Sequence, residues 1–216
     1  MKALLLGSIG VIAETSELQR QAYNRAFAEQ GLDWYWSVAN YCEILKYPGG
    51  KKRLASYSNG KLSSDLIDKI HYSKETFFED SVKNGLVPRE GLVECIDFCL
   101  ARNIKIGLVT TTTQRMVNLL AKGLENHLDF NCFDIITTKA DVVEEKPSGE
   151  VYRYAARKLG VSHEDALAVE DTEVNQEAAL QEQIFCYLYA GEYATTRHNL
   201  NAIKTLAVLT NQSLGT

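Results

Sequence analysis

Hydrophobic positions divide the chain into a short apolar run, a long helical stretch and a final alternation of the two patterns. The apolar run at residues 3–6 has the length of a buried parallel strand, and it stops at Gly7-Ser8-Ile9-Gly10. From residue 16 to residue 84 the apolar residues recur at helical spacing, and no strand pattern interrupts them. We therefore expect one strand, a loop at residues 7–10, and then a block made only of helices.

After Pro88 the pattern changes to strands that alternate with helices. Strands are predicted at residues 105–109, 133–137, 166–169 and 184–189, and helices at 91–102, 114–124, 150–159 and 173–181. Such alternation indicates a parallel sheet with helices on both faces. Because the first strand precedes the helical block, the sequence predicts an α/β core, residues 1–15 plus 88–216, with a helical cap, residues 16–87, inserted after the first strand.

The amino-acid composition is typical of a globular protein. The 216 residues are 45% hydrophobic and carry a net charge of −5, which suits a globular protein and disfavours binding to nucleic acid or to an anionic membrane. No apolar stretch approaches the ~20 residues that span a bilayer, so we expect a cytoplasmic location. The five cysteines contain no Cys-x-x-Cys pair, and we interpret them as reduced core residues.

Three polar clusters follow the predicted strands, where parallel sheets bind their ligands. Thr110-Thr111-Thr112 and Lys146-Pro147 supply hydroxyls, amides and a positive charge, which suit phosphate oxygens. Glu170-Asp171 supplies two carboxylates, which can hold Mg²⁺ or, without metal, pair with Lys146. Alone, a threonine run is commonly a capping sequence, and Glu-Asp before a helix commonly compensates the charge of the helix N-terminus. Together and in this order they predict a phosphate site.

The order of these clusters resembles the haloacid dehalogenase superfamily. Its first motif, Asp-x-Asp-Gly-[Val/Thr]-[Leu/Ile], aligns with Gly7-Ser8-Ile9-Gly10-Val11-Ile12 after the first strand. The later motifs match GLVTTTT at residues 107–113, Lys146-Pro147, and VEDT at residues 169–172. The resemblance implies a Rossmann-like, three-layer parallel-sheet core with an inserted helical cap. It also implies a phosphatase scaffold that binds phosphate through Thr110, Thr111 and Lys146, and metal through Glu170 and Asp171.

Segments of the cap narrow the resemblance to one branch. AETSELQRQAYNRAF, GLDWYW, GGKKR and AGEY are similar to the CbbY-like and β-phosphoglucomutase-like sugar-phosphate phosphatases. This implies that Glu17, Gln19, Gly50 and Lys51 meet a phosphorylated sugar, with Glu17 at its hydroxyls and Lys51 at its far end. Lys51 is equally typical of a solvated helix start.

Two positions depart from the family pattern. In the family the first Asp of motif one attacks phosphorus, and the second acts as general acid and base. Gly7 and Ile9 stand at these two positions, so no catalytic residue is expected there. The first Asp also normally ligates Mg²⁺, so binding of this cofactor is expected to be weakened.

Several functions remain open from the sequence. The first is a degenerate phosphatase-like protein that keeps phosphate or sugar-phosphate binding without efficient hydrolysis. The second is an active hydrolase with an unusual nucleophile, for which Ser8 with Glu14 as its base is the available pair. The third is a scaffold that binds an unknown protein, and the fourth a nucleotide loop at residues 7–10, which lacks the Walker lysine.

Overall fold

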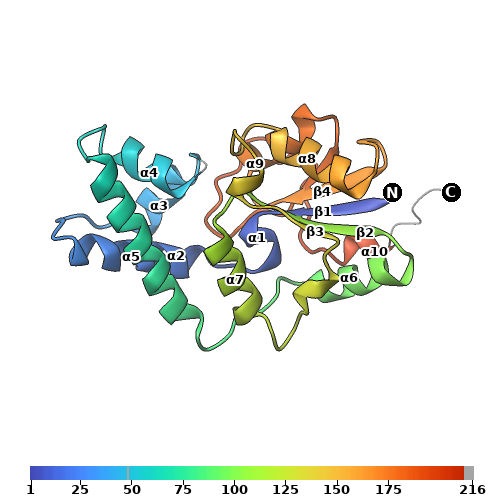
Figure 1. Cartoon of the computed structure of the whole chain (residues 1–216), viewed down its shortest axis with the longest axis horizontal. Helices are drawn as coiled ribbons and strands as arrows, with labels where there is room; N and C mark the ends of the chain where they lie inside the picture. Colours follow the sequence, from blue (N-terminus) through green and yellow to red (C-terminus); the bar gives the residue numbers. More distant parts are fainter. Residues whose placement is uncertain (48, 212–216) are drawn as a thin grey trace.

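The sheet lies at the centre of the larger part of the molecule, with helices above and below it (Figure 1). The computed structural model describes residues 1–47 and 49–211. Five parallel strands form the sheet in the order β3-β2-β1-β4-β5. They are β1 (Ala3–Gly7), β2 (Lys105–Val109), β3 (Ile135–Ile136), β4 (Ala166–Glu170) and β5 (Phe185–Leu188). The first strand is therefore central, and the residues at its carboxyl end lie between those of β2 and β4.

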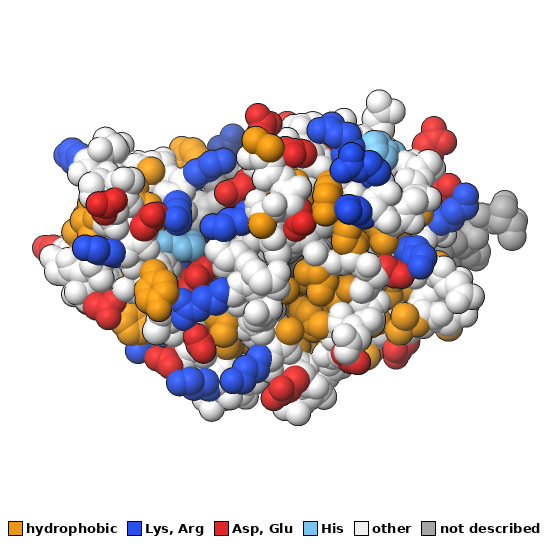
Figure 2. All heavy atoms as spheres, viewed as in Figure 1, with side chains coloured by type: hydrophobic (Ala, Val, Ile, Leu, Met, Phe, Trp, Pro, Cys, Tyr) orange, Lys and Arg blue, Asp and Glu red, His pale blue; other side chains and the backbone are white. Residues whose placement is uncertain are grey.

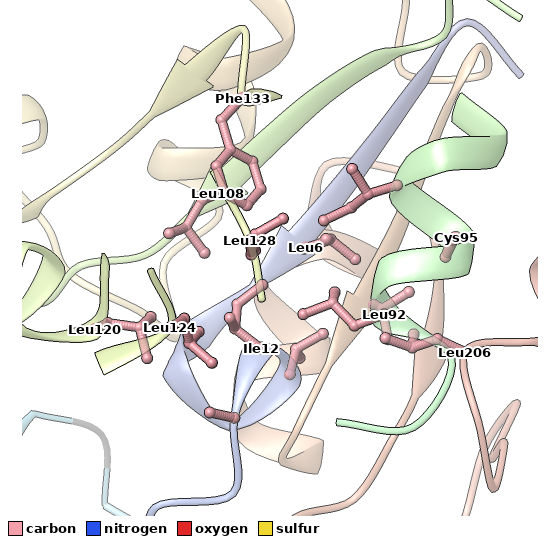
Figure 3. Packing of buried hydrophobic residues seen from close by; sticks show 14 of the residues in the cluster. Leu6, Ile12, Leu92, Cys95, Leu108, Leu120, Leu124, Leu128, Phe133 and Leu206 are labelled. Carbon is pink, nitrogen blue, oxygen red and sulfur yellow. The ribbon is translucent and has the colours of Figure 1, made fainter. Parts of the chain in front are cut away.

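Alternate side chains of β1 enter two different hydrophobic clusters, as period-two strand geometry requires. Leu4 and Leu6 pack into the larger cluster, part of which Figure 3 shows, whereas Ala3 and Leu5 pack into the smaller one. Helices α1 (Ser8–Ile12), α6 (Leu92–Ala101), α7 (Gln114–Gly123) and α10 (Val208–Asn211) contribute to the larger cluster, and α8 (Glu150–Leu159) and α9 (Glu173–Gln181) to the smaller one. Short 3-10 turns, η1 (Phe130–Cys132) and η2 (Lys139–Asp141), flank β3. Both faces of the sheet are thus buried.

Four helices that follow α1 form a separate unit beside the sheet (Figure 1). They are α2 (Ser16–Glu29), α3 (Val38–Ile44), α4 (Gly50–Tyr57) and α5 (Ser64–Val82), and we call them the helical insert. Aromatic residues dominate its own core, in which Trp36 packs against Tyr23, Phe27, Tyr41 and Tyr57. The chain leaves and re-enters the sheet layer at one place, where Ala13 and Pro88 form an antiparallel bridge.

Local sequence signals explain several helix boundaries. The hydroxyls of Ser63 and Thr113 accept hydrogen bonds from Leu66 N and Met116 N, which satisfies backbone donors at the starts of α5 and α7. Gly31 and Gly160 follow α2 and α8 at φ values of 67° and 69°, a left-handed conformation that glycine adopts without steric cost. In the described ranges no helix is long and apolar enough to cross a membrane.

The predicted fold class is confirmed, with two local corrections. Residues 8–12 form the short helix α1 where a loop was expected, so only Gly7 of the predicted loop belongs to the strand. Strand β3 has two residues where five were predicted. The limits of the inserted cap, residues 16–87, stay a prediction, which the return crossing at Pro88 supports.

Candidate functional site

A cavity of about 250 Å³ lies between the helical insert and the carboxyl ends of the central strands. From the sheet side it is lined by Ile9 and Gly10 after β1, by residues 110–113 after β2, and by Asp171 after β4. The helical insert contributes the opposite wall, which includes Tyr23, Tyr41, Gly50, Lys51, Arg53, His71, Lys74 and Glu75. The cavity therefore occupies the position at which parallel α/β sheets bind their ligands.

Positive charge predominates around this cavity, although the whole chain is acidic. Among the described lining residues, six are Lys or Arg and three are Asp or Glu. The cations are Lys51, Lys52, Arg53, Lys74, Lys139 and Lys146, and the anions are Glu75, Glu145 and Asp171. Figure 2 shows Lys and Arg side chains gathered around a histidine where the insert meets the sheet layer. Such a wall attracts an anionic ligand.

Gly7, the last residue of β1, has no room for a side chain. Its backbone is extended, with φ −79° and ψ 151°, so the conformation would accept any residue. A Cβ built on Gly7 would nevertheless collide with the carboxylate of Glu170, and it would lie 2.6 Å from the hydroxyl of Tyr152. The carboxylate of β4 therefore occupies the space from which a residue-7 side chain would project.

Glu170 belongs to a buried polar network rather than to the cavity wall. Its side chain is fully buried and forms an ion pair with Lys146, while the Tyr152 hydroxyl donates to the same oxygen at 2.6 Å. Lys146 also donates to the carbonyl of Val109 at 2.7 Å. Burial raises the pKa of Glu170 above its ordinary value, although the Lys146 ammonium opposes that shift. The network thus neutralises the charge of Lys146 inside the protein.

The threonines after β2 are held in place by hydrogen bonds within the protein. The Thr110 amide donates to Thr137 Oγ1 at 2.9 Å, and the Thr110 hydroxyl accepts from the Thr112 amide at 3.1 Å. Thr110, Thr111 and Lys146 all line the cavity, so the structure brings the three predicted phosphate-binding residues together. Their binding of phosphate stays a prediction.

The carboxylates that were predicted to hold Mg²⁺ are separated by the strand geometry. Glu170 is turned into the buried network. Asp171 lines the cavity, occupies the space into which a side chain at position 10 would project, and accepts from the Asn175 side-chain amide at 3.2 Å. Among the described residues, no group of three or more His, Cys, Asp or Glu side chains is placed to hold a metal ion. Mg²⁺ prefers near-octahedral oxygen ligands, usually with one or two carboxylates free to coordinate it. Of the two predicted carboxylates, Asp171 is the one that faces the cavity, and the weakened binding of Mg²⁺ stays a prediction.

The residues predicted in the helical insert divide into two groups. Gln19, Gly50 and Lys51 line the cavity, and Lys51 also forms an ion pair with Asp68 at 2.7 Å. Glu17 is not among the described lining residues, and its carboxylate accepts from Arg20, Gln21 and Tyr193. Hydrogen bonds from Arg20 lower the pKa of Glu17 to about 2. A ligand contact by Glu17 stays a prediction that this geometry does not support.

Sequence reasoning missed the buried polar residues of the insert that line the cavity. Lys74 is 5% exposed, and Tyr23 and Tyr41 are each 2% exposed. The signal for Lys74 is present in the sequence, because it stands four residues from Ile70 and four from Phe78 on the apolar stripe of α5. The two tyrosines carry no such signal, since buried tyrosine is common in cores.

The hypothesis that Ser8 is a nucleophile with Glu14 as its base is not supported by the position of Glu14. The side chain of Ser8 lies outside the part of the chain that the structure describes. Glu14 accepts from the backbone amides of Ser16 at 2.8 Å and Glu192 at 2.7 Å, so both of its oxygens are engaged. It is also not among the described residues that line the cavity.

Comparison with known proteins supports the same scaffold. A sequence profile described as haloacid dehalogenase-like hydrolase matches residues 10–188. The CbbY protein of Rhodobacter capsulatus is 34% identical over 200 residues, which cover 89% of this chain and 87% of the relative. A phosphorylated carbohydrates phosphatase of Thermotoga maritima is 26% identical over 182 residues, 83% of this chain and 80% of its own length.

A solved structure of a CbbY protein has the same fold as this chain. Mutant CbbY from Rhodobacter sphaeroides, in complex with xylulose-1,5-bisphosphate, superimposes with a TM-score of 0.88. That comparison covers 96% of this chain and 95% of the other, at 31% sequence identity.

Proposed function

Because the chain belongs to the haloacid dehalogenase-like hydrolases, in their CbbY-like branch, we propose that it binds a phosphorylated sugar without hydrolysing it efficiently. The cleft between the helical insert and the sheet is the proposed binding site. A related CbbY holds xylulose-1,5-bisphosphate, and this compound is therefore the first ligand to try.

The proposed loss of hydrolysis rests on the residues at the carboxyl end of β1. Gly7 has no side chain, and the Glu170 carboxylate blocks the space beside it. Ile9, which lines the cavity, has no exchangeable side-chain proton. A reaction at this strand end would therefore lack both an attacking group and a general acid, and acid–base assistance alone is worth ~10²–10⁴ in rate.

Glu170 does not supply the missing nucleophile. It is fully buried, it pairs with Lys146 and Tyr152, and it is not among the described lining residues of the cavity. A nucleophile must reach within about 3–3.5 Å of the reacting atom. A ligand in the cavity would meet Lys146 and Asp171 instead.

The cavity keeps features that support binding of a small anion. Its volume of about 250 Å³ lies just below the ~300–1,000 Å³ of pockets for drug-sized ligands. The excess of cations on its walls favours a phosphorylated compound over a neutral sugar. Hydroxyls of Thr110 and Thr111 supply further donors from the sheet side.

The proposal is tested by measuring binding and turnover on the same preparation. Xylulose-1,5-bisphosphate is titrated by calorimetry, and phosphate release is then followed with Mg²⁺ and with EDTA. The Thermotoga maritima phosphatase, assayed on a panel of phosphorylated carbohydrates, controls for the assay. We expect binding in both conditions and no release. Mg²⁺-dependent release at ~1–10³ s⁻¹ would show an active hydrolase. The same panel of phosphorylated carbohydrates is titrated against this protein, and absence of binding to all of them would favour a partner-binding scaffold.

A further inference from the structure

The side chain of Arg89 holds two segments of backbone that are far apart in the sequence. Its Nη1 donates to the carbonyls of Gly10 and Tyr189, at 2.9 Å each, and its Nη2 donates to the carbonyl of Ala190 at 3.0 Å. The guanidinium carbon also lies 3.4 Å from the centroid of the Tyr189 ring. A planar guanidinium makes all of these contacts at once, whereas the ammonium of a lysine has neither the fork nor the stacking plane. The geometry of its partners therefore requires arginine at position 89.

Arg89 stands where the chain returns from the helical insert to the sheet layer. It follows Pro88, which bridges Ala13 on the outgoing crossing, and its own amide donates to the Ile12 carbonyl at 2.9 Å. Gly10 belongs to the last turn of α1, where helical carbonyls have no partner within the helix. The Arg89 side chain binds that carbonyl, as basic residues often do at the ends of helices. The return crossing and α1 are thus fixed to each other.

The second of the two segments continues from β5 towards the helical insert. We call residues 189–194 the exit loop, and two of them, Gly191 and Ala194, line the cavity. On the insert side, the hydroxyl of Tyr193 donates to the carboxylate of Glu17 at 2.9 Å. The exit loop therefore forms the part of the cavity wall that connects the sheet to the insert.

The outgoing crossing holds the same loop through Glu14. One oxygen of its carboxylate accepts from the Ser16 amide at 2.8 Å, and the other accepts from the Glu192 amide at 2.7 Å. Each of the two crossings between sheet and insert thus contributes one side chain to the exit loop, Glu14 from the outgoing crossing and Arg89 from the return crossing. The position of the loop depends on both crossings as well as on β5.

We propose that Arg89 is a positioning residue for ligand binding, which holds the exit loop and Gly10 at the cavity wall without touching the ligand. The inference rests on the proposed function, because it concerns the same cleft. Arg89 is not among the described residues that line the cavity, so it acts through the backbone of its partners. Gly10 and Gly191 offer only backbone atoms to a ligand. A wall of this kind keeps its shape when the residues behind it fix its backbone.

Hydrogen exchange of the exit loop measures this hold directly and needs no ligand. Arg89→Lys keeps the charge but loses the fork and the stacked plane, so the amides of residues 191–194 should exchange about tenfold faster. Arg102→Lys is the matched control, because the exposed Arg102 stacks on Phe98 at 3.9 Å and neither residue is among the described lining residues. It should leave the exchange of the exit loop unchanged. Urea denaturation checks that both variants fold.

Binding of xylulose-1,5-bisphosphate, measured by calorimetry on the same variants, tests the consequence for the cleft. Arg89→Lys should weaken binding by about tenfold, whereas Arg102→Lys should not change it. An arginine that only stabilised the fold would change neither the affinity of the folded protein nor the local exchange. Glu14→Gln removes one acceptor of the exit loop from the outgoing crossing, and it should speed the same exchange even if Arg89→Lys does not fold.

Each outcome decides between the inference and the proposed function. Unchanged exchange of the exit loop, or unchanged affinity, in folded Arg89→Lys would overturn the inference alone, as would unchanged exchange in Glu14→Gln. Phosphate release from the bisphosphate would overturn the proposed function, and weaker binding by Arg89→Lys would then still support the inference. Absence of binding to the wild type would overturn both.

Discussion

The hydroxyl of Thr113, the capping residue of α7, donates a 2.7 Å hydrogen bond to the carboxylate of Glu75 in the helical insert. Arg115 of α7 lies 3.9 Å from the same carboxylate, and it also binds Glu79 at 2.9 Å and Thr76 at 3.2 Å. These contacts connect the insert to the sheet layer at the rim of the cavity. The side chain of Glu75 is 8% exposed, whereas that of Glu79 is 44% exposed.

We therefore expect Glu75→Ala to reduce the free energy of unfolding by about 1–3 kcal/mol, because it removes the acceptor of the Thr113 hydroxyl and the carboxylate that faces the Arg115 charge. Urea denaturation measures the change. Glu79→Ala is the matched control and should cost no more than about 1 kcal/mol, as exposed ion pairs do. Equal costs for the two variants would show that Glu75 does not tie the insert to the core.

Gly7→Ala tests the conflict between Gly7 and Glu170. The new methyl group must displace the Glu170 carboxylate, so we expect a loss of about 1–3 kcal/mol in the free energy of unfolding, typical of overpacking. The same change is then made in a protein that carries Glu170→Ala and Lys146→Met, which lacks the buried ion pair. There Gly7→Ala should cost less. If Gly7→Ala reduced the free energy of unfolding equally in both backgrounds, the Glu170 carboxylate would not be the group that opposes a side chain at position 7.

Mg²⁺ should not stabilise this protein. Glu170 is engaged in the buried network, and the described residues form no group of three acidic, histidine or cysteine side chains that could hold a metal. A ligand that binds only the folded state raises stability by RT ln(1 + [L]/Kd). Thermal unfolding in EDTA and in increasing Mg²⁺ should therefore give one melting temperature. A rise that saturates with Mg²⁺, and that Asp171→Asn removes, would contradict this.

Stability should depend on pH through Lys74. Burial lowers the pKa of Lys74 to about 7 in the folded protein, from its ordinary value of 10.5 in the unfolded chain. Between these values the unfolded state binds more protons, so the free energy of unfolding should rise with pH. Below pH 7 the full cost of the buried charge is present. Lys74→Met should remove this dependence and stabilise the protein at pH 7 by about 1–3 kcal/mol.

Chemical denaturation of the wild type and Lys74→Met between pH 6 and pH 10 measures this difference. The gap between the two curves should be widest at pH 6–7 and should narrow as the pH rises. A constant gap would mean that Lys74 has an ordinary pKa in the folded state.

Much of the fold followed from local patterns. Strand β2 and helix α8 begin and end where the apolar spacing predicts, and Ser63, Thr113 and Gly160 mark helix ends by capping that acts within a few residues. The short helix α1 was missed, because five residues are too few to show a helical period. Membership of the family, and the absence of aspartate at positions 7 and 9, were likewise visible in the residues alone.

The tertiary structure decided how the site residues are used. The sequence presents Glu170 and Asp171 as an adjacent acidic pair, but successive positions at a strand end face different surroundings. Glu170 pairs with Lys146 beneath Gly7, and Asp171 faces the cavity. Lys74 likewise shows its apolar stripe in the sequence, yet only the assembled structure shows its ammonium group buried near the rings of Tyr23 and Phe78. Spacing records local geometry, whereas burial and ion pairing depend on neighbours that folding brings from distant parts of the chain.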